Sequence, residues 1–294
     1  AVTFIDAGNI GGGGFMTVKM DNDIAFLDYR EKAPLKAHKD MYLDEQGNVI
    51  DSITLIGGQA AGVPGTVAGF WEAHKRFGKL PWEDVVQPAI DLAANGFIPA
   101  PILVDSIHSM QQRFDGKTNF NDYFNHINSS KVFKQPELAK TLARIAEFGA
   151  DDFYRGKTAT LIVEEMKRSN GLISAEDLDQ YSPVWREPVR ANWRDYEVVS
   201  APPPSSGGFA IVQLLKMKDY LAEHFANVEH NSAQYIHLIA EMEKRVFADR
   251  AEYLGDPDFF DVDINALIDD NYVSKRAAEV NPNAISSLKS INPG

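Results

Sequence analysis

The sequence has 294 residues, 44% hydrophobic and 24% charged, a composition typical of a globular protein with one large domain or two modest ones. Its 42 acidic and 29 basic side chains give a formal net charge of -13, which repels polyphosphate and excludes DNA and RNA as expected partners. The absence of cysteine excludes disulfides, a thiol nucleophile and cysteine-ligated zinc or iron–sulfur sites.

The first part of the chain carries no signal-like segment and is rich in glycine. Residues 1–6 lack a basic region and an apolar core, and no apolar stretch reaches the ~18 to 20 residues of a membrane-spanning helix, so we expect a soluble polypeptide without a membrane partner. The run Gly11 to Gly14 is followed by a strand pattern, whereas a phosphate-binding loop needs a helix there. We therefore favour close packing of backbone against backbone for this run.

A β-hairpin is predicted next, and it leads into Arg30. Residues 15–20 alternate apolar and polar side chains, residues 21–23 supply a turn, and residues 24–29 are rich in strand formers. A guanidinium can bind a carboxylate through two parallel hydrogen bonds, worth roughly 1.5–3 kcal/mol each. Arg30 is therefore our candidate substrate-binding residue. The alternative is an ordinary salt bridge from Arg30 to Glu31 or Asp28.

Helices are predicted to dominate from about 65 to 187. The large side chains from Val67 to Phe77 recur at helical spacing before Gly78, and further helices are expected over 85–95, where Pro88 implies a start or a kink, and over 138–148 and 158–166. Ser174 and Asp177 have the spacing of a capping box for the turn that follows.

The pattern then returns to strands and ends in helices. Residues 188–191 and 196–200 suit a hairpin that returns to the sheet, and the apolar spacing over 211–215 and 235–246 predicts two more helices. We therefore expect sheet-forming parts at about 1–64 and 188–210, helical regions at about 65–187 and 207–280, and a linker tail over 281–294, all within one fragment.

Other side-chain groups offer weaker signals for chemistry. The segment Ser205-Ser206-Gly207-Gly208 opens a helix and is a candidate anion or oxyanion site, although we favour a plain N-cap. His230 and His237 are too far apart for one metal, so we expect no metal site. The acidic residues from Glu241 to Asp258 alternate with basic ones, which is typical of a solvated, salt-bridged helix face; a cation at the turn of residues 256–258 stays open.

Five segments together resemble the large N-terminal chain of the γ-glutamyltranspeptidase family, nearly end to end. They occur in the family's order and cover residues 7–16 (AGNIGGGGFM), 28–34 (DYREKAP), 62–69 (GVPGTVAG), 202–208 (PPPSSGG) and 248–258 (ADRAEYLGDPD). The resemblance implies an Ntn-hydrolase-type layered α/β/β/α architecture, here the large-chain part with an extensive helical region.

The resemblance also implies a reaction and a division of labour. Family members are zymogens that cut themselves into a heterodimer, and the threonine freed at the start of the small chain attacks γ-glutamyl amides such as glutathione, after which water or an acceptor amine takes the glutamyl group. The family's large chain contributes an arginine for the substrate α-carboxylate, and the matching position is Arg30. No catalytic residue is expected in this chain, and no cofactor.

The resemblance leaves alternatives open. A poly-γ-glutamate depolymerase or a β-lactam acylase shares the framework, and a non-catalytic orphan binding subunit is a third reading. We expect the sequence to stop short of the cleavage junction and to lack an upstream segment that belongs to the core in relatives. The relatives imply a periplasmic or secreted location and the small chain of the same precursor as partner.

Overall fold

The computed structural model describes residues 2–5 and 8–294, which divide into two compact units. Among the described residues, unit 1 comprises residues 2–5, 8–16 and 27–184, and unit 2 comprises residues 17–26 and 185–294. The division falls within a β-hairpin, because the chain passes from unit 1 to unit 2 and back through residues 17–26. Each unit has its own hydrophobic core.

The predicted hairpin is present. Strand β1 spans Phe15–Met20 and β2 spans Asp23–Asp28, and Asp21 has the positive φ of 53° that a tight turn requires. The short strand β3, Val184–Arg186, follows β2 in the order β1-β2-β3. The second half of β2 is buried, so its end, where Tyr29 and Arg30 follow, is firmly packed.

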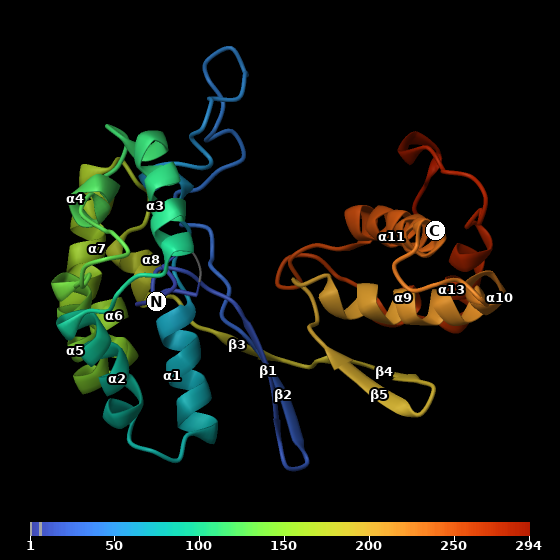
Figure 1. Ribbon diagram of the computed structural model, residues 1–294, viewed down its shortest axis with the longest axis horizontal. Helices are drawn as coiled ribbons and strands as arrows, with labels where there is room; N and C mark the ends of the chain where they lie inside the picture. The colour runs from blue at the N-terminus through green and yellow to red at the C-terminus, as the bar shows by residue number, and fades with distance from the viewer. Residues whose placement is uncertain (1, 6–7) are drawn as a thin grey trace. The chain divides into compact units, whose positions relative to one another are not determined.

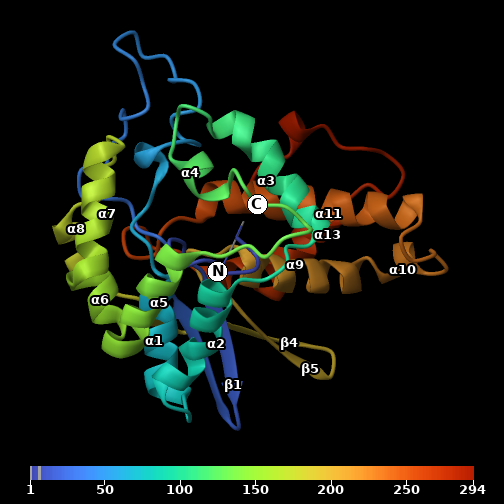
Figure 2. The same cartoon turned by 60° about the vertical axis from the view of Figure 1, so that its left-hand side comes forward.

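Unit 1 is mainly helical, as the sequence predicts for the region after residue 65 (Figure 1). Its helices are η1 (Gly58–Ala60), α1 (Thr66–Phe77), α2 (Trp82–Asn95), α3 (Pro101–Phe114), α4 (Phe120–Phe124), α5 (Pro136–Phe148), α6 (Ala150–Arg155), α7 (Lys157–Arg168) and α8 (Ala175–Asp179). Helices α2 and α5 lie side by side in both ribbon views (Figures 1 and 2). Because α2 begins at Trp82, Pro88 lies inside the helix and does not start it.

The capping box predicted at the start of α8 is confirmed. The Ser174 hydroxyl accepts from the Asp177 amide at 3.2 Å, and the Asp177 carboxylate accepts from the Ser174 amide at 2.7 Å. The other oxygen of Asp177 accepts from the amide of Leu35, 142 residues away, at 2.6 Å. One aspartate thus caps a helix and also fixes the loop that follows Arg30.

Unit 2 is built from a β-hairpin and a group of helices (Figure 1). Its further elements are β4 (Val189–Trp193), β5 (Tyr196–Ser200), α9 (Gly207–Tyr220), α10 (Ala222–Phe225), α11 (Ala233–Tyr253), α12 (Ile264–Leu267), α13 (Asp270–Ala278) and η2 (Leu288–Ser290). The hairpin pairs antiparallel with Trp193 opposite Tyr196. In the described part of the chain it forms a two-stranded sheet of its own, so the expected return to the first sheet is wrong.

The core of unit 2 lies between α9, α11 and α13. Phe209, Met217, Leu238, Met242 and Val273 are almost completely buried there. The tail from residue 281 is irregular apart from η2, in keeping with its composition. Among the described residues, no helix is both long and apolar enough to cross a lipid bilayer.

Candidate functional site

Arg30 stands at the surface of unit 1 directly after buried strand β2. Its backbone is held at both ends, because its amide donates to the Asp28 carboxylate at 3.0 Å and its carbonyl accepts from the Tyr181 hydroxyl at 2.9 Å. The side chain is exposed, and its guanidinium lies over the ring of Phe15, 5.8 Å from the centroid. Arginine stacks well on an aromatic face, which restricts the side chain without using its hydrogen-bond donors.

The guanidinium of Arg30 forms no hydrogen bond or ion pair with any residue that the structure describes, so the expected alternative of a salt bridge to Glu31 or Asp28 is not formed there. Its fixed backbone and free donors suit an incoming carboxylate, which can accept two parallel hydrogen bonds. The arrangement can therefore bind an anionic group, and its geometry favours a planar carboxylate.

The glycine run packs against the backbone on either side of Arg30, as expected. Gly14 and Tyr29 exchange two backbone hydrogen bonds of 3.2 and 3.0 Å, and the Gly12 carbonyl accepts from the amides of Gly65 and Thr66 at 2.8 and 3.0 Å. A Cβ on Gly13 would lie 2.7 Å from both the Glu31 amide nitrogen and the Tyr29 carbonyl oxygen. Only glycine allows this approach.

Gly65 also packs closely against the segment around Arg30. A Cβ on Gly65 would collide with the Tyr181 hydroxyl and the Tyr29 carbonyl oxygen. The bridge between Lys32 and Val63, with hydrogen bonds of 3.2 and 2.8 Å, holds the following residues in register. The chain around Arg30 is therefore fixed by backbone contacts with segments 12–14 and 63–66.

Buried tyrosines support the same segment. Tyr181 stacks on Tyr154 with centroids 5.4 Å apart, and the Tyr154 hydroxyl donates to the Pro64 carbonyl at 2.7 Å. Burial raises the pKa of Tyr181, and the nearby Tyr154 and Asp28 raise it further. The raised pKa keeps the Tyr181 hydroxyl protonated at neutral pH, so it remains a donor to the Arg30 carbonyl.

The sequence did not indicate these supporting residues. Tyr181 is 151 residues from Arg30 along the chain, and nothing in its local pattern distinguishes it from an ordinary core aromatic. The only local pattern close to Tyr181 in the sequence is the capping box of α8. Its Asp177 accepts from the Leu35 amide, so this short helix also contacts the loop after Arg30.

The segment Ser205 to Gly208 starts α9, and its two glycine amides already have partners in unit 2. The Gly207 amide donates to the Ser205 hydroxyl at 3.1 Å and the Gly208 amide donates to the Ala201 carbonyl at 3.1 Å. Ser206 occupies the N-cap position without a capping bond, and its hydroxyl accepts from Arg250 at 3.0 Å. The two glycine amides are therefore engaged, which agrees with a segment that starts the helix.

The salt-bridged face predicted on α11 is solvated only in part: Glu243, Arg250 and Glu252 are exposed, whereas three other charged residues are buried. Glu241, Arg245 and Asp249 are 1%, 4% and 0% exposed and form ion pairs inside unit 2. At the turn after α11, Asp258 forms a bidentate pair with Arg186, at 2.8 and 3.0 Å. No group of three or more potential metal ligands occurs among the described residues.

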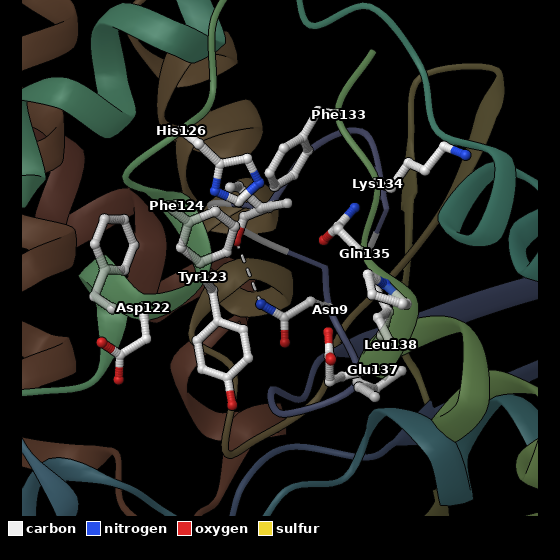
Figure 3. A pocket seen from close by; sticks show the side chains of 14 residues that line it. Asn9, Asp122, Tyr123, Phe124, His126, Phe133, Lys134, Gln135, Glu137 and Leu138 are labelled. Atoms are coloured by element: carbon white, nitrogen blue, oxygen red, sulfur yellow. Dashed lines mark hydrogen bonds between the residues drawn. The ribbon is translucent and has the colours of Figure 1, made fainter.

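A pocket of about 730 Å³ in unit 1 was not expected from the sequence (Figure 3). Aromatic rings of Phe120, Tyr123, Phe124 and Phe133 line it, and Figure 3 shows the His126 ring beside Phe133. Its polar groups are partly engaged locally, because Asn9 donates to the Ile5 carbonyl at 3.4 Å and accepts from the Gly11 amide at 2.9 Å. Arg30 does not line this pocket.

Comparisons with known proteins agree with one another. The sequence matches the family profile described as gamma-glutamyltranspeptidase over residues 1–293. A glutathione hydrolase proenzyme of Pseudomonas aeruginosa is 55% identical over 294 residues, which cover 100% of this chain and 53% of the relative. An acylase ACY 1 proenzyme of Pseudomonas sp. (strain SE83) is 33% identical, over 91% of this chain and 50% of the relative.

A solved structure gives the same result for the fold. Gamma-glutamyltranspeptidase from Pseudomonas nitroreducens, solved in complex with L-DON, superposes with a TM-score of 0.97 at 54% identity, covering 99% of this chain and 87% of that one. The chain has the expected Ntn-hydrolase-type fold, in its large-chain part. It spans about half the length of the curated relatives it matches.

Proposed function

The chain belongs to the γ-glutamyltranspeptidase family, and from that premise we propose that it is the large-chain part of a two-chain γ-glutamyltransferase or glutathione hydrolase. Its partner is a small chain cut from the same precursor, and its substrate is a γ-glutamyl amide such as glutathione. The relatives named as proenzymes support a precursor of this kind. We also propose a periplasmic or secreted location, which rests on the family alone.

The observation that carries the proposal is that the backbone of Arg30 is anchored while its side chain is exposed. Its backbone is anchored by Asp28 and Tyr181, while its guanidinium is exposed and makes no hydrogen bond or ion pair with any described residue. In our proposal this guanidinium binds the α-carboxylate of the glutamyl group through two parallel hydrogen bonds. Binding at that end leaves the γ-carbonyl extended toward the nucleophile.

The chemical step uses the small chain. The hydroxyl of its N-terminal threonine attacks the γ-carbonyl carbon, the amine leaves with a proton, and water or an acceptor amine then takes the glutamyl group from the threonine oxygen. This chain supplies substrate binding and not the nucleophile. The chain alone is therefore catalytically silent, and the reaction needs no cofactor.

The principal test examines Arg30 in the assembled enzyme with a chromogenic γ-glutamyl anilide. We expect Arg30→Ala to raise KM at least about tenfold, because charge-assisted bonds contribute roughly 1.5–3 kcal/mol and 1.4 kcal/mol is tenfold in affinity. Arg30→Lys should recover little, since an ammonium lacks the planar fork. Arg113→Ala, which removes an exposed arginine of α3, is the matched control and should leave KM unchanged.

A substrate analogue identifies the group that Arg30 binds. The anilide whose α-carboxylate is replaced by a carboxamide should be a poor substrate for the wild type, and Arg30→Ala should make it no worse. Equal losses for both substrates in the variant would remove Arg30 from carboxylate binding. Release of the chromophore by the purified chain alone, above blank, would overturn the two-chain assignment.

The same assays separate the alternatives. An acylase should prefer acylated β-lactams to the γ-glutamyl anilide, a preference that the 33% identical acylase relative makes worth measuring. A poly-γ-glutamate depolymerase should shorten the polymer and release little from the anilide. An orphan binding subunit should bind glutamate or glutathione without any turnover, even when supplied with a small chain.

A further inference from the structure

Lys32 brings a second exposed cation to the segment of unit 1 that carries Arg30. Its backbone is paired with Val63: the Lys32 amide donates to the Val63 carbonyl at 3.2 Å, and the Lys32 carbonyl accepts from the Val63 amide at 2.8 Å. The Lys32 ammonium lies over the ring of Tyr181, 5.6 Å from the centroid. Within residues 2–5 and 8–294 it forms no hydrogen bond or ion pair, so its donors are available to a ligand.

Arg30 and Lys32 are held in the same way. Each has a backbone fixed by hydrogen bonds and a cationic group over an aromatic ring. The ring is that of Phe15 for Arg30. Tyr181 supports both residues, because its hydroxyl donates to the Arg30 carbonyl at 2.9 Å and its ring lies under the Lys32 ammonium. An aromatic face attracts a cation without using its hydrogen-bond donors, so both groups remain able to bind anions.

Glu31, the acid between the two cations, faces the glycine run. A Cβ on Gly13 would lie 2.8 Å from a carboxylate oxygen of Glu31. Backbone pairing on both sides of Glu31 keeps this segment extended. Because successive side chains of an extended chain point to opposite faces, Arg30 and Lys32 share the face away from Glu31. The two cations are therefore not neutralised by the residue between them.

The wider segment is basic in an acidic chain. Residues 30–39 carry four basic side chains and one acidic one, whereas the whole chain has a formal net charge of -13. The four basic side chains are all exposed: Arg30, Lys32, Lys36 and Lys39. A local positive charge on a negative protein directs anions to this segment and attracts a dianion more strongly than a monoanion.

A ligand held at Arg30 by one carboxylate can reach Lys32 with a second. Two residues of extended chain separate the two Cα atoms by about 7 Å. A γ-glutamyl tripeptide carries a carboxylate at each end and spans about 10 Å when extended. The flexible four-carbon stem of lysine covers the difference. With the glutamyl α-carboxylate at Arg30, the C-terminal carboxylate of such a peptide is thus within reach of the Lys32 ammonium.

We propose that Lys32 is a specificity-determining residue: its ammonium binds a second carboxylate, carried by the leaving part of the substrate, while Arg30 binds the first. This inference rests on the proposed function and names its substrate class, which is γ-glutamyl peptides with a free C-terminal carboxylate in preference to γ-glutamyl amides of neutral amines. An ammonium suits this role, because a compact charge on a flexible stem binds a carboxylate without requiring one planar orientation.

The test compares two chromogenic substrates in the assembled enzyme: the neutral γ-glutamyl anilide and the same anilide with a carboxylate on its ring. The wild type should have a KM about twofold to fivefold lower for the carboxylated anilide, as an exposed ion pair provides. Lys32→Met should remove this difference, and Lys32→Arg should keep it because the charge remains. Lys140→Met, at an exposed lysine of α5, is the matched control and should keep the wild-type difference.

Salt provides a readout that a purely structural role of Lys32 would not move. The KM difference between the two anilides should shrink as the ionic strength rises from about 0.01 M to 1 M, because the Debye length falls from about 30 Å to about 3 Å. Equal KM values in the wild type, or a difference that Lys32→Met leaves intact, would overturn the inference. An equal rise of KM for both anilides in Lys32→Met would overturn it too, since Lys32 would then act on the α-carboxylate or on Arg30.

Titration calorimetry separates this inference from the proposed function. If the wild-type enzyme turns over neither anilide, the proposed function fails. The binding of glutathione is then compared with that of glutathione whose C-terminal carboxylate is replaced by a carboxamide. Tighter binding of glutathione to the wild type, with the difference lost in Lys32→Met, supports the site for a second carboxylate, and the absence of a difference overturns it.

Discussion

Removing one hydroxyl group tests how Arg30 is held. Tyr181→Phe keeps the ring that stacks on Tyr154, at 5.4 Å between centroids, and deletes the 2.9 Å hydrogen bond to the Arg30 carbonyl. Tyr181 is 7% exposed, so water cannot readily replace the lost donor. A hydrogen bond of this kind contributes about 1 kcal/mol net, and the carbonyl left without it adds to the loss. We expect unit 1 to lose about 1.5 kcal/mol of its free energy of unfolding.

Two assays measure the effect of Tyr181→Phe. In thermal unfolding of the chain, about 1.5 kcal/mol lowers Tm by about 3–6 °C for a unit of this size. In the assembled enzyme, a less well-fixed Arg30 should raise KM for a γ-glutamyl anilide up to about fivefold and leave kcat unchanged. Tyr196→Phe, at a tyrosine that is 69% exposed, is the control and should change neither. A lowered Tm with an unchanged KM would refute the positioning of Arg30 by this hydroxyl, and no change in either would refute the hydrogen bond itself.

Three further predictions concern the backbone supports and the buried charges. Gly13→Ala should lower the free energy of unfolding by about 2 kcal/mol, because a Cβ there would lie 2.7 Å from backbone atoms. Gly11→Ala should lower it by much less, because a Cβ there would lie 3.4 Å from a side-chain oxygen. Equal urea midpoints for the two variants would contradict this. Asp177→Ala should speed proteolysis of the loop at Leu35, which loses its 2.6 Å bond, and an unchanged cleavage rate would count against it. The pKa of Glu241 is about 2 in the folded protein and 4.5 by its ordinary value. The ionised carboxylate therefore stabilises the folded state fully above about pH 4.5, and this stabilisation is lost as the pH falls toward 2. The free energy of unfolding of Glu241→Gln should vary less with pH over that range, and identical pH profiles for variant and wild type would disprove the link.

Local patterns predicted the elements well where one segment decides the outcome. The alternation over residues 15–20 and the polar turn before β2 specify a hairpin, and Gly78 ends α1 where the helical spacing stops. The capping box depends only on Ser174 and Asp177, three positions apart, so it too could be predicted from the local sequence. These features need no information from distant parts of the chain.

Patterns failed where a distant partner decides. The charges of α11 alternate as on a solvated face, yet Arg276 of α13 contacts Asp249 and the tail contacts Glu241, and neither partner can be predicted from the helix itself. The same difference between local patterns and distant contacts holds for the candidate site. The residue type of Arg30 and its place after a strand suggested a carboxylate-binding role, which stays a proposal, whereas its support by Tyr181 depends on a contact across 151 residues. Side-chain identity states what a group can bind, and only the fold states which groups hold it in place.

The spacing along α11 also limits how this helix can change in evolution or by design. Each residue added to an α-helix rotates the rest of the helix by about 100°, so one insertion between Arg245 and Asp249 would swing Asp249 away from Arg276 of α13. Substitution on the outer face, as at Phe247, which is 57% exposed, leaves that phase intact. The helix can therefore tolerate substitutions on its outer face but not an insertion between Arg245 and Asp249.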